Sequence, residues 1–104
     1  MKVLCIGHAS YDISMLVDEY PKENTKYRIE NVVECGGGPA ATAAYLLGKW
    51  NIDTTFKGVV GQDVFGTRII EEFKKVNVDT KYMELDKEVD TTISFILVNK
   101  RTGS

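Results

Sequence analysis

The chain changes character where three glycines lead into an alanine-rich run, Gly36-Gly37-Gly38-Pro39-Ala40-Ala41-Thr42-Ala43-Ala44-Tyr45-Leu46-Leu47. The glycines predict a break in the chain, and the proline after them suits the first position of a helix. We expect this helix to run from Ala40 to Trp50 and to end near Asn51. Because the helix is apolar on nearly all sides, we expect it to be buried, with its small residues close to a sheet.

The segment before the glycines is predicted to be mostly extended. A short apolar run from Val3 to Ile6, bounded by Gly7, predicts a buried first strand. Residues 13–17 are expected to form a second extended piece, followed by a polar turn around Pro21. Residues 27–34 mix apolar and polar side chains, which favours a half-exposed strand or edge ribbon over a helix.

After the alanine-rich run, strands and helices are expected to alternate. Residues 54–60 predict a strand, and Asp63 is placed to cap a helix over residues 64–75. Residues 81–85 form a weak strand pattern, whereas residues 91–98 form a strong one that is rich in β-branched side chains. This alternation predicts an α/β fold with a layered sheet and right-handed crossovers.

The length and composition of the chain limit its possible functions. Its 104 residues suffice for one small domain. The net charge of -2 provides no basic field for a nucleic acid. The apolar run at the N-terminus is too short for a signal-peptide core or a membrane span, so we expect a cytoplasmic protein. The single histidine and two distant cysteines match no zinc site. We expect no metal site, nucleic acid or membrane partner for this chain.

The glycine cluster is the sharpest candidate for binding chemistry. Gly36, Gly38 and Ala41 fit the loose dinucleotide pattern G-x-G-x-x-[G/A], but that motif normally follows the first strand of a βαβ unit. A glycine-rich turn that opens a helix also presents free N–H groups, which suit phosphates, carboxylates or sugar hydroxyls. The alternative is that the glycines only form a sharp turn and let the helix pack closely.

Two aspartates are further candidates. Asp12 lies just beyond the expected end of the first strand, where open α/β sheets bind ligands. Its carboxylate can accept hydrogen bonds from two adjacent hydroxyls, although a solvated turn aspartate is the alternative. The block Gly61-x-Asp63-x-x-Gly66 is interpreted as a helix cap and a turn, not as a ligand site.

Four blocks together resemble the N-terminal portion of the ribokinase or PfkB carbohydrate kinase family. They are Val3-Leu4-Cys5-Ile6-Gly7 through Asp12, then Glu34-Cys35-Gly36-Gly37-Gly38-Pro39-Ala40, then Gly58-Val59-Val60-Gly61-Gln62-Asp63-Val64-Phe65-Gly66, and Thr91-Thr92-Ile93-Ser94-Phe95 running to Asn99 and Gly103. The resemblance covers essentially the whole chain. It implies that residues 1–104 form part of a ribokinase-like three-layer sandwich, with a small β-sheet lid over about residues 13–35.

The resemblance implies phosphoryl transfer from ATP to a sugar or sugar-like alcohol, with Mg²⁺ and often a monovalent cation. It assigns substrate-binding positions to Asp12, Ser10, Gly37, Gly38, Ala41 and Ser94. Asp12 would hold sugar hydroxyls, Ser10 would replace a polar Asn, and the glycines would admit the sugar close to the backbone. Ser94 would face the sugar. Many members carry Asn at the position of Ala41, so the pocket would suit a different polyol or a substituted sugar.

The family's catalytic Gly-Ala-Gly-Asp segment has no counterpart in these 104 residues. No catalytic residue is therefore expected in this chain, and the chain alone is expected to be inactive as a kinase. In several family members two lids pack together, which implies a homodimer through the lid as one arrangement. A non-catalytic dimerisation module is the alternative function, and a dinucleotide-binding domain ranks below it.

Overall fold

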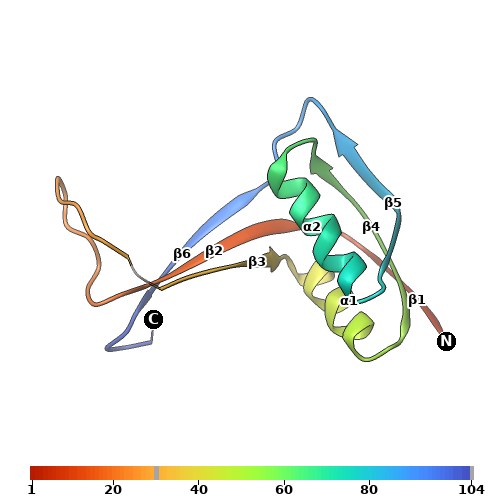
Figure 1. Cartoon of the computed structure of the whole chain (residues 1–104), viewed down its shortest axis with the longest axis horizontal. Helices are drawn as coiled ribbons and strands as arrows, with labels where there is room; N and C mark the ends of the chain where they lie inside the picture. The colour runs from red at the N-terminus through yellow and green to blue at the C-terminus, as the bar shows by residue number, and fades with distance from the viewer. Residues whose placement is uncertain (30, 104) are drawn as a thin grey trace.

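The computed structural model describes residues 1–29 and 31–103, and across these ranges it forms two three-stranded sheets and two helices (Figure 1). The first sheet, called here the core sheet, is entirely parallel with strand order β1-β4-β5. Its strands are β1 (Lys2–Ile6), β4 (Asp53–Gly61) and β5 (Asp79–Asp86). Parallel strands joined by helices are the expected outcome of the alternating pattern in the sequence.

The second sheet, called here the outer sheet, is mixed and has strand order β3-β2-β6. Strand β2 (Ser10–Val17) lies in its centre, antiparallel to β3 (Val32–Gly37) and parallel to β6 (Ile93–Asn99). The outer sheet extends away from the helices and gives the molecule its long axis of 49 Å (Figure 1). The strongly β-prone segment predicted over residues 91–98 therefore joins this sheet and not the core sheet.

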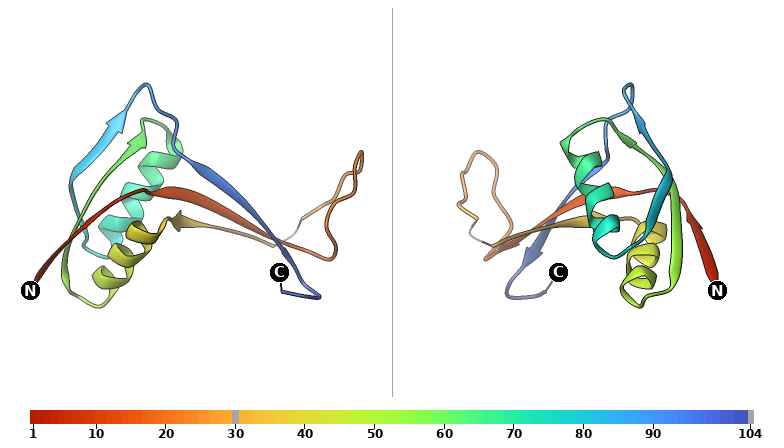
Figure 2. Two further views of the ribbon diagram at one scale, coloured as in Figure 1. Left: turned by 180° about the vertical axis from the view of Figure 1, so that it is seen from behind. Right: turned by 45° about the vertical axis from the view of Figure 1, so that its right-hand side comes forward.

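Both helices, α1 (Pro39–Lys49) and α2 (Val64–Lys75), cover the same face of the core sheet (Figure 2). The expectation that the first strand is buried is wrong: on β1, Cys5 packs against the core, while Leu4 and Ile6 point away from it and are exposed, because helices cover only one face of the core sheet. The described part of the chain thus contains two layers of the expected three-layer sandwich. Within it, neither helix is long and apolar enough to cross a membrane.

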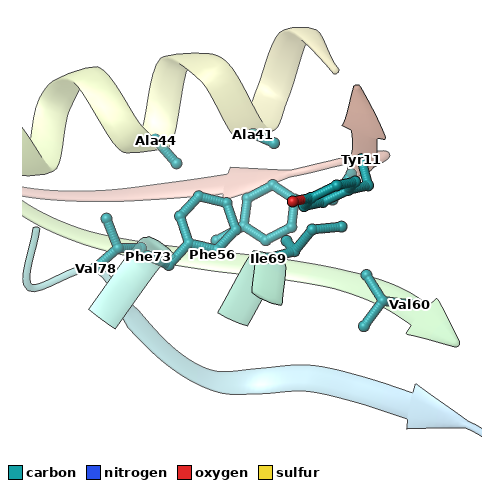
Figure 3. Packing of buried hydrophobic residues seen from close by; sticks show 9 residues of the cluster. Tyr11, Ala41, Ala44, Phe56, Val60, Ile69, Phe73 and Val78 are labelled. Atoms are coloured by element: carbon teal, nitrogen blue, oxygen red, sulfur yellow. The ribbon is translucent and has the colours of Figure 1, made fainter. Parts of the chain in front are cut away.

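The main hydrophobic cluster lies between the helices and the core sheet (Figure 3). Phe56 of β4 is fully buried and stacks on Phe73 of α2, with ring centroids 4.9 Å apart. Ala41 and Ala44 bring α1 close to these rings. Burial of one such phenylalanine contributes about 1.5–3 kcal/mol to stability.

The expectation that α1 is buried on all sides is wrong. Its buried residues are Ala41, Ala44 and Gly48, whereas Leu46 and the following Trp50 are 42% and 62% exposed. The physical reason is that α1 contacts the core sheet along one stripe, and nothing in the described ranges covers its opposite side. A stripe of small residues on one side of α1 lets the helix approach the core sheet closely, whatever side chains its other sides carry.

The predicted bounds hold for most elements, but the strand before the glycines is displaced. It begins at Val32 and not at Tyr27, and it continues through Gly36 and Gly37 because β2 pairs with it as far as Ser10. The break falls at Gly38, which has a φ of 97°. Residue 30 of the predicted ribbon lies outside the described residues. Asp12 likewise lies inside β2 and not in a turn.

Candidate functional site

Asp12 stands in the centre of the outer sheet, in a row of three side chains that crosses all its strands. The strand register pairs Asp12 with Cys35 on β3 and with Ser94 on β6. Cross-strand partners point to the same face of a sheet, so these three side chains are neighbours. The structure thus brings together two of the predicted site residues, Asp12 and Ser94, and adds Cys35 to them.

The carboxylate of Asp12 is held in place by two further predicted residues. Ser10 Oγ donates a hydrogen bond of 2.9 Å to Asp12 Oδ1, and Ser10 is the cross-strand partner of Gly37. A Cβ atom on Gly37 would overlap Asp12 Oδ2, so the carboxylate occupies the space that the glycine leaves open. An oriented carboxylate of this kind can accept hydrogen bonds from a ligand's hydroxyl groups.

Cys35 is a site-lining residue that sequence reasoning missed. Burial raises the pKa of its thiol above the ordinary value, and the negative charges of Asp12 and Glu72 raise it further. The thiol is therefore a neutral neighbour of Asp12 at physiological pH. The signal that could have identified it is the antiparallel register of β2 and β3, which a single sequence does not reveal.

Gly38 and Ala41 occupy different environments from Asp12. Gly38 begins the first turn of α1, and a Cβ atom on it would lie 2.5 Å from the carbonyl oxygen of His8. Its glycine identity therefore permits two chain segments to cross closely. Ala41 is only 5% exposed and belongs to the hydrophobic cluster beside Phe56 (Figure 3). Their roles toward a ligand stay predictions.

A buried carboxyl group lies behind the glycines, on the side of α2. Glu72 Oε2 is buried without a hydrogen-bond partner among the described residues, next to a cavity of about 260 Å³ lined in part by Gly36 and Ala41. Burial raises the pKa of Glu72, and the nearby Gly36 N–H group opposes that shift. An acid in such a place favours its protonated form.

The interpretation of Asp63 as a helix cap is confirmed, because its Oδ1 accepts a 2.8 Å hydrogen bond from the Gly66 N–H group. Asp63 also binds Thr91, whose N–H group and hydroxyl donate to it at 3.0 and 2.7 Å. These bonds hold the pKa of Asp63 below its ordinary value, with the Thr91 N–H group as the largest cause. Sequence reasoning missed Thr91 in this role.

Comparison with known proteins assigns the chain to a family over its full length. Residues 1–104 match the pfkB family carbohydrate kinase profile. Ribokinase of Staphylococcus aureus (strain COL) is 31% identical over 99 residues, which are 94% of this chain and 33% of that protein. A nucleoside kinase of Methanothermobacter thermautotrophicus is 27% identical over 97 residues, which are 93% of this chain and 31% of that protein.

The fold is also that of solved ribokinases. The structure of Arabidopsis thaliana ribokinase complexed with ribose and ATP aligns with a TM-score of 0.85 at 24% identity, over 99% of this chain and 33% of that one. The chain spans about a third of the length of the curated relatives it matches and corresponds to their N-terminal portion. It belongs to the pfkB family of carbohydrate kinases.

Proposed function

We propose that this chain supplies the sugar-binding part of an ATP-dependent sugar kinase and that its outer sheet acts as a lid over the sugar. The observation that carries the proposal is the Asp12 carboxylate, which accepts a 2.9 Å hydrogen bond from Ser10 Oγ and occupies the space that the missing Cβ atom of Gly37 leaves. Hydroxyl groups of a sugar would donate to this carboxylate. Membership of the family supports the reaction class.

The neighbours of Asp12 suit a polyol and not a charged ligand. Ser94 offers a hydroxyl that can donate or accept, and the neutral Cys35 thiol adds no charge to the row. Gly37 leaves room for the Asp12 carboxylate that would bind the sugar. A sheet that covers the sugar would exclude water, which protects a phosphate donor from hydrolysis.

Phosphoryl transfer would draw on residues beyond those described. ATP would supply the transferred γ-phosphoryl group, and Mg²⁺ and a monovalent cation would balance its charge. Within residues 1–29 and 31–103, no three His, Cys, Asp or Glu side chains gather as metal ligands. The proposed contribution of the described residues is to bind and cover the sugar.

A second copy of the chain is the partner that the outer sheet suits. Val33 and Ile96 flank Ser14 on the face that carries Asp12, and they are 62% and 39% exposed. Apolar residues at a sheet surface favour association with another protein. A homodimer through this lid would cover them, and dimerisation without any sugar is the alternative function.

The test is a titration of the ¹⁵N-labelled chain with D-ribose, D-fructose and adenosine, followed by NMR. Binding is expected to shift the amides of Ser10, Asp12, Gly37 and Ser94 for at least one of these ligands. Asp12→Asn should weaken binding at least about tenfold, because it removes a charged acceptor. The matched control is Asp18→Asn, since the Asp18 side chain is 90% exposed. Equal affinity of wild type and Asp12→Asn would refute the proposal.

A steric pair sharpens this test without changing any charge. In Gly37→Ala the new methyl group overlaps the Asp12 carboxylate, so sugar affinity should fall about tenfold. In Gly36→Ala the new methyl group lies 3.1 Å from Glu72 Oε2, the end of a flexible side chain on the other face, so affinity should hold. If the two alanine variants bind the sugar equally well, the carboxylate above Gly37 is not the contact.

A further inference from the structure

The chain crosses between the core sheet and the outer sheet at three places, and each crossing is fixed differently (Figure 1). Residues 7–9 join β1 to β2, and the Gly7 N–H group donates to Lys57 O at 3.1 Å. Gly38 joins β3 to α1 and lies against His8. Residues 87–92 join β5 to β6, and this longest crossing is the one that meets Asp63.

The block Gly61-x-Asp63-x-x-Gly66 forms a socket for Thr91. A Cβ atom on Gly61 would lie 2.6 Å from the Thr91 backbone nitrogen, and one on Gly66 would lie 3.0 Å from Thr91 Oγ1. The two glycines therefore leave space that Thr91 shares with the Asp63 carboxylate and with the backbone carbonyls of Gly61 and Val89. Thr91 is only 5% exposed, so the fit excludes water.

The hydroxyl and the N–H group of Thr91 both form hydrogen bonds inside this socket. Its hydroxyl donates to Asp63 Oδ1 at 2.7 Å and accepts from the Gly61 N–H group at 2.9 Å. Its N–H group donates to Asp63 Oδ2 at 3.0 Å. Two of these three bonds involve a carboxylate, and charge-assisted bonds are stronger than neutral ones. Loss of the hydroxyl would leave buried partners unpaired, which is more damaging than loss of an exposed bond.

The socket lies at the base of the strand that reaches the sugar site. The residue after Thr91 is already bonded to the outer sheet, because Thr92 O accepts a 2.8 Å hydrogen bond from the Tyr11 N–H group just before β6 begins. Ser94, three residues beyond Thr91, pairs with Asp12. A shift of Thr91 is therefore transmitted through a short stretch of paired strand to the row that contains Asp12.

We infer that Thr91 is a positioning residue: the socket fixes the base of β6 and thereby holds Ser94 beside Asp12 and the outer sheet on the core. Thr91 touches no proposed ligand itself. The predicted effect on sugar affinity rests on the proposed function, whereas the predicted effect on the outer sheet does not. The two effects can be measured separately.

The experiment compares three variants of this chain by amide hydrogen exchange and by titration with the best-binding of D-ribose, D-fructose and adenosine. Thr91→Val keeps the shape of the side chain and removes its hydroxyl, while Thr91→Ser keeps the hydroxyl. The control is Thr54→Val, because Thr54 is 1% exposed in β4 and its hydroxyl donates to Ile52 O at 2.8 Å. Thr91→Cys, which keeps a weak donor, is a milder form if Thr91→Val does not fold.

In Thr91→Val, the amides of β6 should exchange at least about tenfold faster relative to those of β4, because local opening no longer breaks the socket bonds. Ligand affinity should fall about tenfold, and Thr91→Ser should restore both. Thr54→Val should lower the overall stability, but it should leave the ratio of amide exchange rates in β6 and β4 unchanged. Equal acceleration in β4 and β6, or failure of Thr91→Ser to restore the ratio, would overturn the inference. If wild type binds none of the three ligands, the proposed function fails while the exchange ratio still decides the role of Thr91.

Discussion

The core sheet and the outer sheet have the same number of strands but are stabilised differently. The core sheet is parallel and buries one face under two helices, with Phe56 fully inaccessible. The outer sheet meets the helices at its base, where Tyr11 contacts Phe65 of α2 at a ring-centroid distance of 5.2 Å, and at its far end Val17 is also buried. Farther out it exposes Phe95 and Val33, which are 69% and 62% exposed. Hydrophobic burial therefore supports one sheet, and strand pairing and anchored crossings support the other.

This difference explains why the candidate site lies where it does. Asp12, Ser10 and Gly37 lie at the end of the outer sheet nearest the core, next to two of its crossings. Segments with few buried contacts open at lower free energy than a packed core. The base of the outer sheet is thus held by hydrogen bonds and packing, and its far part is expected to open more easily. A lid over a small ligand requires that combination.

The comparison is tested most strongly by removing one phenylalanine from each sheet. Phe56→Ala should lower the free energy of unfolding by about 3–5 kcal/mol, because it leaves a cavity beside Phe73. Phe95→Ala should lower it by about 1 kcal/mol or less, because the ring is mostly in water. Urea unfolding followed by circular dichroism measures both. Similar losses in the two variants would mean that the outer sheet is packed against something in solution, for which a concentration-dependent midpoint is the check.

The second prediction uses two carboxyl groups that border the outer sheet and have opposite pKa shifts. The pKa of Asp63 is lowered by its hydrogen bonds, so its contribution is present above the ordinary Asp value and is lost as pH falls through the folded value. The pKa of Glu72 is raised by burial, so stability is lost as pH rises through its folded value. The stability difference between wild type and Asp63→Asn should therefore shrink on acidification.

Glu72→Gln should show the reverse dependence. Glutamine stays neutral, so this variant gains stability relative to wild type as the pH rises from acid to neutral. Asp63→Asn should also be less stable than wild type at neutral pH by about 1–3 kcal/mol, because its amide group faces the Thr91 N–H donor. Urea midpoints measured from acid to neutral pH give both curves. Parallel curves for the two variants would contradict the assigned environments.

Local signals made the helices predictable from sequence. Pro39 stands at the start of α1, and Asp63 caps α2 through a residue three positions away. Apolar runs also marked the core strands β1 and β4, whereas β5 gave only a weak strand pattern. For the same reason Asp12 and the glycines could be selected as candidates, since each is unusual in its own segment.

The remaining features depend on pairing between distant segments. Gly36 and Gly37 belong to a strand only because β2 pairs with them, and Cys35 meets Asp12 for the same reason. Thr91 finds its partners 28 and 30 residues earlier in the chain. Nothing near Thr91 in the sequence distinguishes it from a threonine that fills an ordinary strand. The sequence of β6 likewise does not show which sheet the strand joins, because its composition suits either one.

The smallest effect is expected where a charged side chain links the helices to the outer sheet. Arg68 of α2 lies 3.9 Å from Glu34 Oε1 and 3.5 Å from the Tyr11 hydroxyl, with its guanidinium 5.9 Å from the Tyr11 ring centre. Both charged side chains are about half exposed, so Arg68→Gln should cost about 1 kcal/mol or less. The matched control is Lys81→Gln, because Lys81 lies 3.7 Å from Asp79 Oδ2 and 5.1 Å from the Tyr82 ring centre within β5.

The two variants should lose similar amounts of stability, but in different parts of the molecule. Arg68 joins α2 to β2 and β3, so its removal should speed amide exchange in the outer sheet at low salt, and added salt should reduce the difference from wild type. The contacts of Lys81 stay inside the core sheet, so its removal should leave outer-sheet exchange unchanged. Hydrogen exchange at two salt concentrations measures this. If both variants change amide exchange in the outer sheet equally, side-chain links between α2 and the outer sheet do not hold that sheet in place. Strand pairing and the anchored crossings would then hold it alone.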